Sequence, residues 1–224
     1  MKKYHLMWPK KLSKNVQVNN FNKFRSNYEY NCFKLLYLFI IIILAGSFCS
    51  AMLTDDSRWM NWHFSRLGEG SAFSSMIFNV AIFLSAIVML ALAISLSNNV
   101  SKIRSNQNFD AIRAKTIIYR AFTAVTVCLI GVSLFPFDRF PVVHNICGYS
   151  MLFVFLALCI TAPKFLPIFS KNFYIYSKVV LLCVIICYTL FIVFQTVTLL
   201  SIEFVIFIFL YGWLFLFIKG IYRN

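Results

Sequence analysis

Two short polar stretches carry most of the side chains that could do chemistry in this chain. The first, residues 54–70, reads TDDSRWMNWHFSRLGEG, and the second, residues 131–150, reads GVSLFPFDRFPVVHNICGYS. Together they hold two of the three histidines, His63 and His144, and four of the seven acidic residues. A histidine beside a carboxylate can act as a general acid and base, so these stretches are the first place to look for a reaction.

The second stretch suggests the more specific arrangement. His144 is predicted to serve as a base or hydrogen-bond donor, with Asp138 orienting it and His63 as a further candidate from the first stretch. Arg66 and Arg139 could hold an anion, because the guanidinium group matches the geometry of a phosphate. The other predicted contacts to a ligand are Ser65, Asn79, Glu69 and Asp55.

The elements that must position these residues are membrane helices. The chain is 61% hydrophobic and only 12% charged, whereas soluble domains average about 25% charged residues. Its long apolar runs are typical of membrane spans, which excludes a water-soluble enzyme. We predict an all-α, polytopic membrane protein, a bundle of six transmembrane helices. The predicted spans are residues 33–53, 71–96, 116–135, 142–162, 179–200 and 203–218.

The predicted domain organisation follows from these spans. Residues 1–33 form a basic tail with little expected fixed structure, residues 34–219 form the membrane domain, and residues 220–224 form a second tail. The first apolar run is longer than a usual signal peptide core, so we expect an uncleaved signal anchor. The fifth and sixth spans are expected to join through a tight turn at residues 201–202.

The charges predict the orientation of the bundle. The tails, the polar loops at residues 97–115 and 163–178, and the adjoining span ends hold 18 of the 21 Lys and Arg residues. The positive-inside rule therefore places both termini in the cytoplasm (N-in/C-in), in the inner (cytoplasmic) membrane of a cell. The +14 net charge does not indicate nucleic-acid binding, because these basic residues flank membrane spans rather than form a basic soluble domain.

This topology brings the candidate residues to one face. Residues 54–70, 136–141 and 201–203 all emerge on the outer side, and His144 is expected in the first helical turn of its span. Asn79 lies eight residues into the second span, so its amide should face the bundle rather than lipid. Three interpretations remain open. The polar cluster could fasten helix ends, it could form a pocket for a lipid headgroup or similar amphiphile, or it could hold a metal or haem between His63 and His144.

Two of the motifs resemble those of a known family. Ser65-Arg66-Leu67-Gly68 followed by Phe78-Asn79 resembles one signature of a bacterial and archaeal membrane family, the domain of unknown function nine-nine-eight. Gly131 and Phe135-Pro136, followed by Asp138 and His144, resemble its second signature. The resemblance implies a six-span bundle related to the Frag/DRAM/Sfk membrane proteins, whose eukaryotic relatives are linked to lipid remodelling and lipid homeostasis. It also implies that Ser65, Asn79, Asp138 and His144 belong to the site.

The function predicted from sequence is the handling of a lipid headgroup or similar amphiphile at an outer polar site, with hydrolysis as one form of that handling. The alternative is a non-enzymatic membrane subunit, an assembly or immunity factor, or a small transporter, with a purely structural polar cluster. Membrane lipids are the predicted partners, with a membrane-protein partner or a second copy of the chain as alternatives. No cofactor is predicted.

Overall fold

The computed structural model describes residues 14–70, 72–103, 111–165, 169–195 and 198–222. Over these residues the chain is all-helical, which confirms the predicted fold class. The six candidate spans are apolar segments of 23 to 28 residues, each long enough to cross a bilayer that needs about 20, and the fifth, Lys171–Phe194, includes two consecutive helical elements. The elements are α1 (Lys14–Leu53), η1 (Ser57–Asn61), η2 (Phe64–Gly68), α2 (Phe73–Ile103), α3 (Ala111–Leu134), α4 (Pro141–Phe165), α5 (Lys171–Thr189), η3 (Leu190–Phe194) and α6 (Leu199–Tyr222).

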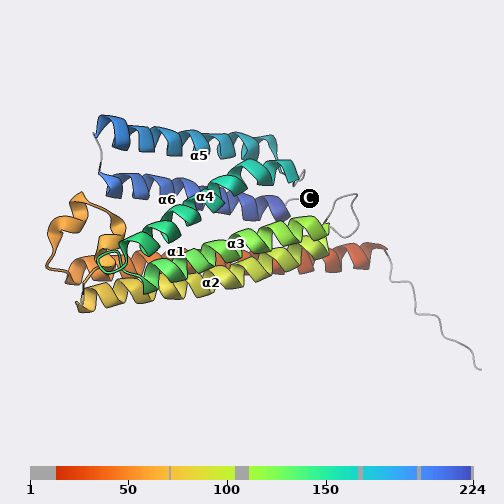
Figure 1. The fold of residues 1–224 in the computed structure, drawn as a ribbon. Helices are drawn as coiled ribbons and strands as arrows, with labels where there is room; N and C mark the ends of the chain where they lie inside the picture. The colour runs from red at the N-terminus through yellow and green to blue at the C-terminus, as the bar shows by residue number, and fades with distance from the viewer. Residues whose placement is uncertain (1–13, 71, 104–110, 166–168, 196–197, 223–224) are drawn as a thin grey trace, which may run out of the picture.

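The helices form one bundle with two distinct ends (Figure 1). Helix α2 packs between α1 and α3, α6 packs against α1, and α5 lies outermost, against α6 and α4. The short helices η1 and η2 gather at one end, together with the α3–α4 and α5–α6 connections. We call this the loop end. The C-terminus of α6 lies at the opposite end, which we call the terminal end.

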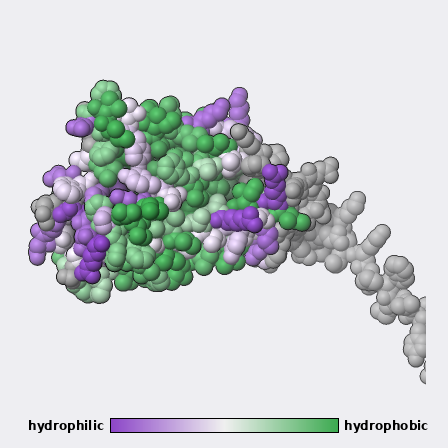
Figure 2. Space-filling model, viewed as in Figure 1, coloured by the Kyte–Doolittle hydropathy of each residue, from purple (hydrophilic) through white to green (hydrophobic). Residues whose placement is uncertain are grey.

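The surface of the bundle has the pattern of a membrane protein. Figure 2 shows a band of hydrophobic side chains around the middle of the helices, with hydrophilic residues collected towards both ends. Large apolar side chains such as Ile87, Phe153 and Ile185 are exposed on this band. In water such a surface would be unfavourable, whereas hydrocarbon solvates it. The chain is therefore an integral membrane protein with six candidate spans. The side that each end faces remains a prediction.

Close helix packing depends on glycine at two crossings. A Cβ atom on Gly46 of α1 would lie 2.1 Å from the Cβ of Ala81 on α2, and one on Gly131 of α3 would lie 2.3 Å from the Sγ of Cys147 on α4. A side chain at Gly46 would force α1 and α2 apart, and one at Gly131 would displace the Cys147 side chain. The absence of a side chain at Gly131 permits the close contact of α3 with α4.

A closed polar network fastens the terminal end. The hydroxyl of Tyr222 lies 3.1 Å from the Sγ of Cys32 and accepts a 2.6 Å hydrogen bond from the amide of Asn99. Ser95 completes the group, with its hydroxyl 3.2 Å from Cys32. Cys32, Asn99 and Tyr222 are buried, and they come from α1, α2 and α6. These uncharged groups satisfy one another and hold the last turn of α6 against the bundle.

The connection between α5 and α6 differs from the tight turn expected at residues 201–202. Those residues lie inside α6, and the chain reverses earlier, after a π-helical turn whose last cap, Gln195, has a left-handed backbone (φ 51°). Thr198 then caps α6, because its hydroxyl accepts the backbone N–H of Ser201 at 3.2 Å. Several polar residues, Gln195, Thr196, Thr198 and Ser201, interrupt this stretch, and composition alone does not identify which of them caps the helix.

Other boundaries extend beyond the predicted spans. Helix α1 begins at Lys14, so residues 14–33 continue the first span as helix rather than lacking structure; residues 1–13 lie outside the described part, as do residues 223–224 of the C-terminal tail. Helix α4 continues two residues past Pro163, and α5 begins at Lys171 instead of residue 179. Polar residues mark where the apolar segment ends, but a helix can continue into water beyond it.

Candidate functional site

The loop end is built around a short segment that is anchored to three helices. The backbone N–H of Phe64 donates a 2.6 Å hydrogen bond to Glu203 Oε2 on α6. The amide of Asn79 on α2 donates to the carbonyl of Gly68 at 2.9 Å, which confirms that Asn79 faces the bundle. The hydroxyl of Ser50 on α1 donates to the carbonyl of Leu67 at 3.4 Å. These contacts fix η2 as a rigid cover over the end of the bundle.

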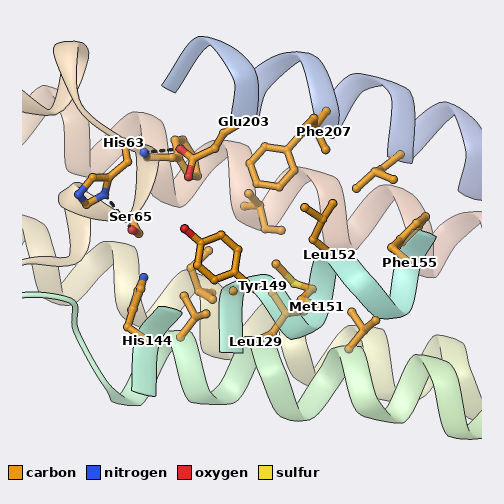
Figure 3. A pocket seen from close by; sticks show the side chains of 18 of the residues that line it. His63, Ser65, Leu129, His144, Tyr149, Met151, Leu152, Phe155, Glu203 and Phe207 are labelled. Atoms are coloured by element: carbon orange, nitrogen blue, oxygen red, sulfur yellow. Dashed lines mark hydrogen bonds between the residues drawn. The ribbon is translucent and has the colours of Figure 1, made fainter. Parts of the chain in front are cut away.

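A cavity of about 380 Å³ lies beneath η2, between α1–α3 on one side and α4–α6 on the other. Its inner part is apolar, and Figure 3 shows Leu129, Met151 and Phe155 lining this part. Its loop end is polar. The polar or ionisable side chains there are His63, Ser65, His144, Asn145, Tyr149, Tyr188 and Glu203.

The cavity also reaches the surface. Tyr149 and Asn145 line it and are both exposed, which places an opening beside α4. Gly148 lines the cavity about two turns into α4, and a Cβ atom added there would meet no atom within 4 Å. This open space distinguishes Gly148 from the tightly packed Gly131 of the neighbouring helix. Pockets of this size, mostly apolar with a few convergent polar groups, are the usual form of small-molecule sites.

His63 connects the η2 segment to the polar part of the cavity. It is the N-cap residue of η2 and has an extended backbone, so its ring reaches back over the first turn. Its Nδ1 lies 3.0 Å from the Ser65 hydroxyl, and its Nε2 lies 3.5 Å from Glu69 Oε1. Burial, with smaller effects from the charges of Arg66 and His144, lowers the pKa of His63 below its ordinary value. The ring is therefore neutral at pH 7.

His144 enters the same cavity from the first turn of α4, where sequence predicted it. It is buried, and its Nδ1 lies 2.9 Å from the carbonyl oxygen of Phe135. That oxygen can only accept, so Nδ1 carries the hydrogen and the neutral ring keeps Nε2 as an acceptor. The Phe137 ring contacts both histidines edge-on, at 5.1 Å from His63 and 5.9 Å from His144. The two histidines thus share one polar site.

Asp138 makes its contacts elsewhere. Its Oδ2 accepts a 3.2 Å hydrogen bond from the backbone N–H of Gly70 and lies 3.9 Å from Arg139 Nε. It links the α3–α4 connection to the loop before α2. The contact that orients His144 comes instead from the Phe135 carbonyl, because the tight turn after α3 directs this oxygen towards the start of α4.

The predicted anion holders lie outside the cavity wall. Arg66 sits between two carboxylates, 3.4 Å from Asp56 and 3.5 Å from Glu69, and its guanidinium stacks over the ring of Trp62 at 4.5 Å. These partners hold its two terminal nitrogens, while its buried Nε makes no hydrogen bond among the described residues. Arg139 is largely exposed, and so is Asp55. We call the group around Arg66 the arginine clamp, because it holds η1 and η2 together.

Four of these polar cavity residues were missing from the sequence-based site. Glu203 was assigned to the outer face but not to the site, and Asn145, Tyr149 and Tyr188 were not singled out. Glu203 had a detectable signal, because it is an acidic residue inside a long apolar run, where ionisable groups are usually functional. The tyrosines had none, since nothing in the local sequence separates a cavity tyrosine from one at the membrane interface.

A metal centre has no support from the geometry of the described residues. Among them, no three His, Cys, Asp or Glu side chains come together as a group that could hold a metal ion. His63 and His144 both contact the Phe137 ring edge-on.

No family model matches the chain, and the searches of curated proteins and of solved structures also found no match. The resemblance to the domain of unknown function nine-nine-eight therefore stays a prediction from short motifs. The site must be interpreted from its own geometry.

Proposed function

We propose that this membrane protein binds a single-chain amphiphile in the cavity beneath η2, with its headgroup among His63, His144 and Glu203 and its hydrocarbon chain along α4. The observation that supports this most directly is the division of the cavity. Apart from Tyr211, its polar side chains gather at the loop end, and its inner walls are otherwise aliphatic and aromatic. An amphiphile has the same division, and burial of each CH₂ group is favourable by about 0.8 kcal/mol in transfer from water.

The headgroup is expected to be uncharged. Among the described residues that line the cavity there is neither Lys nor Arg, and the nearest guanidinium is held in the arginine clamp. A phosphate would enter without a cation to pair with, next to the carboxylate of Glu203. A hydroxyl-bearing head, such as a glycerol, can instead donate to Glu203 and to the acceptor nitrogen of His144, and accept from Tyr149.

The position of the site agrees with the predicted topology. The loop end carries acidic residues and few basic ones, so we place it on the outer side of the cell membrane and both termini in the cytoplasm. The resemblance to lipid-linked membrane families points in the same direction. On this proposal the opening beside α4 lets the ligand exchange with the surrounding bilayer.

A second function rests on the arginine clamp. Its charges are paired with one another, and it joins η1 to η2 without contributing to the cavity wall. A purely structural role of the loop end, as in a membrane subunit or assembly factor, would need only this clamp. The cavity distinguishes the two functions, because a structural cap has no use for an open apolar space beneath it.

The test uses the full chain, extracted in detergent and loaded with excess monoolein, an uncharged single-chain amphiphile. Gly148→Phe fills the open space at the cavity wall, while Gly148→Ala adds only a methyl group and serves as the matched control. Native mass spectrometry should show one retained monoolein on the wild type and on Gly148→Ala, and at least tenfold less on Gly148→Phe. Equal retention by all three proteins, or none by the wild type, would refute the proposal.

A further inference from the structure

The polar part of the cavity contains a serine, a histidine and a carboxylate arranged in series. Ser65 Oγ lies 3.0 Å from His63 Nδ1, and the opposite nitrogen of the ring, Nε2, lies 3.5 Å from Glu69 Oε1. Ser65 and His63 both line the cavity. Glu69 lies behind the ring, with 15% of its side chain exposed. A nucleophile, a base and a group that orients the base, in this order, are the parts needed for nucleophilic catalysis.

From this arrangement we infer that the site cleaves the ester of a neutral acyl lipid, with Ser65 as the nucleophile and His63 as its general base. The inference rests on the proposed function, because the amphiphile in the cavity is the substrate. Ser65 lies at the polar end, near the point where the walls become apolar. In a monoacylglycerol the ester lies at the matching position, between the glycerol head and the hydrocarbon chain.

The tautomer of His63 fits this role. Glu69 Oε1 lies 3.5 Å from Nε2 and makes no hydrogen bond to it, but because a carboxylate oxygen carries no hydrogen, its proximity favours the ring form that carries its hydrogen on Nε2. The lone pair is then on Nδ1, directed at the Ser65 hydroxyl. The lowered pKa of His63 keeps the ring neutral and able to accept a proton at pH 7. Glu69 is a positioning residue in this scheme, since it touches the base and not the substrate.

The reaction would proceed in two balanced steps. The Ser65 hydroxyl attacks the ester carbonyl carbon while its proton passes to His63, the carbon–oxygen bond to glycerol breaks, and the departing alkoxide takes the proton from His63. Water then attacks the acyl–serine ester, its proton passes to His63, and the fatty acid leaves as Ser65 recovers the proton. The Tyr149 hydroxyl, which Figure 3 shows at the same end of the cavity, is a suitable donor to the oxyanion.

The test combines covalent labelling with lipid turnover. An alkyl fluorophosphonate carries an apolar chain and a phosphorus centre that reacts with activated serines. Intact-mass and peptide analysis should locate its adduct on Ser65 of the full-length wild type, and monoolein should be converted to oleate. Ser65→Ala should lose both, and His63→Gln should react at least a hundredfold more slowly, since general-base catalysis contributes about 10²–10⁴-fold.

The control is Ser133→Ala, whose buried hydroxyl donates to the Ile130 carbonyl and lies outside the cavity lining. It should label and hydrolyse like the wild type. Monoolein retention by each variant, measured as above, reports that the bundle is intact. If the wild type retains monoolein but neither labels at Ser65 nor forms oleate, the esterase inference is overturned while the binding function stands. If neither the wild type nor Ser65→Ala retains monoolein and no oleate forms, the binding function itself fails.

Discussion

The two ends of this bundle use polar side chains in opposite ways. At the terminal end, Cys32, Asn99 and Tyr222 are uncharged, buried and bonded to one another. At the loop end, ionisable groups are divided between a paired arginine clamp and a cavity in which His63 and His144 retain room for another molecule. Polar groups that hydrogen-bond to one another fasten helices together, whereas polar groups arranged around open space are available to a ligand.

Burial alone therefore does not separate structural from functional polar residues here. His144 is buried, as are Cys32, Asn99 and Tyr222 of the terminal network. The distinguishing feature is whether the polar side chains of a group form hydrogen bonds or ion pairs with one another or face open space. Experiments that remove one member from each region should affect stability in the closed regions and ligand behaviour at the cavity.

The largest effect on stability is expected from the arginine clamp. Arg66→Met would leave Asp56 and Glu69 close together without their shared cation, and the free energy of unfolding should fall by about 2–3 kcal/mol. Thermal unfolding in detergent, followed by tryptophan fluorescence, would measure the loss. Arg139→Met is the matched control, because its exposed pair at 3.9 Å should contribute at most about 0.5 kcal/mol. If the two variants lost the same free energy of unfolding, the stabilising role of the arginine clamp would be contradicted.

A somewhat smaller effect is expected at the terminal end. Asn99→Leu keeps the volume of the side chain but removes the amide that donates to Tyr222, so this buried hydroxyl loses one of its two partners. The expected loss is about 2 kcal/mol, with monoolein retention unchanged at saturating ligand. Asn172→Leu, at an exposed position on α5, should stay within about 0.5 kcal/mol. If Asn99→Leu retained less monoolein but kept its stability, the distinction between a structural terminal end and a ligand-binding loop end would fail.

The smallest effect is expected from mild acid, and only at the loop end. The groups that face His63 are Glu69 and Arg66 on its own loop, His144 on α4, and Glu203 on α6. Because the pKa of His63 is lowered in the folded protein, the unfolded chain binds more protons just below the ordinary pKa of about 6.5. Stability should therefore fall as the pH drops below that value, by at most about 1.4 kcal/mol per pH unit.

Comparison with His63→Gln isolates this contribution. The variant lacks the titrating ring and should show a flatter decline between pH 6.5 and 5.5, measured by the same unfolding assay. Labelling of Ser65 in the wild type should be constant above pH 7 and fall in acid, since the base must be neutral. Identical stability profiles for the two proteins would show that His63 is not held neutral by the fold.

Part of this organisation could be predicted from local sequence. Apolar runs of about 20 residues define six membrane helices, because the thickness of the bilayer fixes the length that is needed. The depth of Asn79 in its span indicated an inward-facing amide, and the position of His144 after Pro141 placed it in the first turn of α4. Each of these depends on a residue and its near neighbours along one helix.

The tertiary structure decided which polar side chains share a site. Glu203 contacts the backbone of Phe64 across 139 residues, and Tyr149 joins the cavity only because α4 packs beside α3 and faces α6. The same packing places Arg66 in the arginine clamp and His63 at the cavity wall, although the two residues are only three positions apart in the sequence. Composition and charge thus determined that this chain forms six membrane helices with polar ends. Helix packing determined which polar residues are paired with one another and which face open space, since that depends on distances between elements that no local pattern encodes.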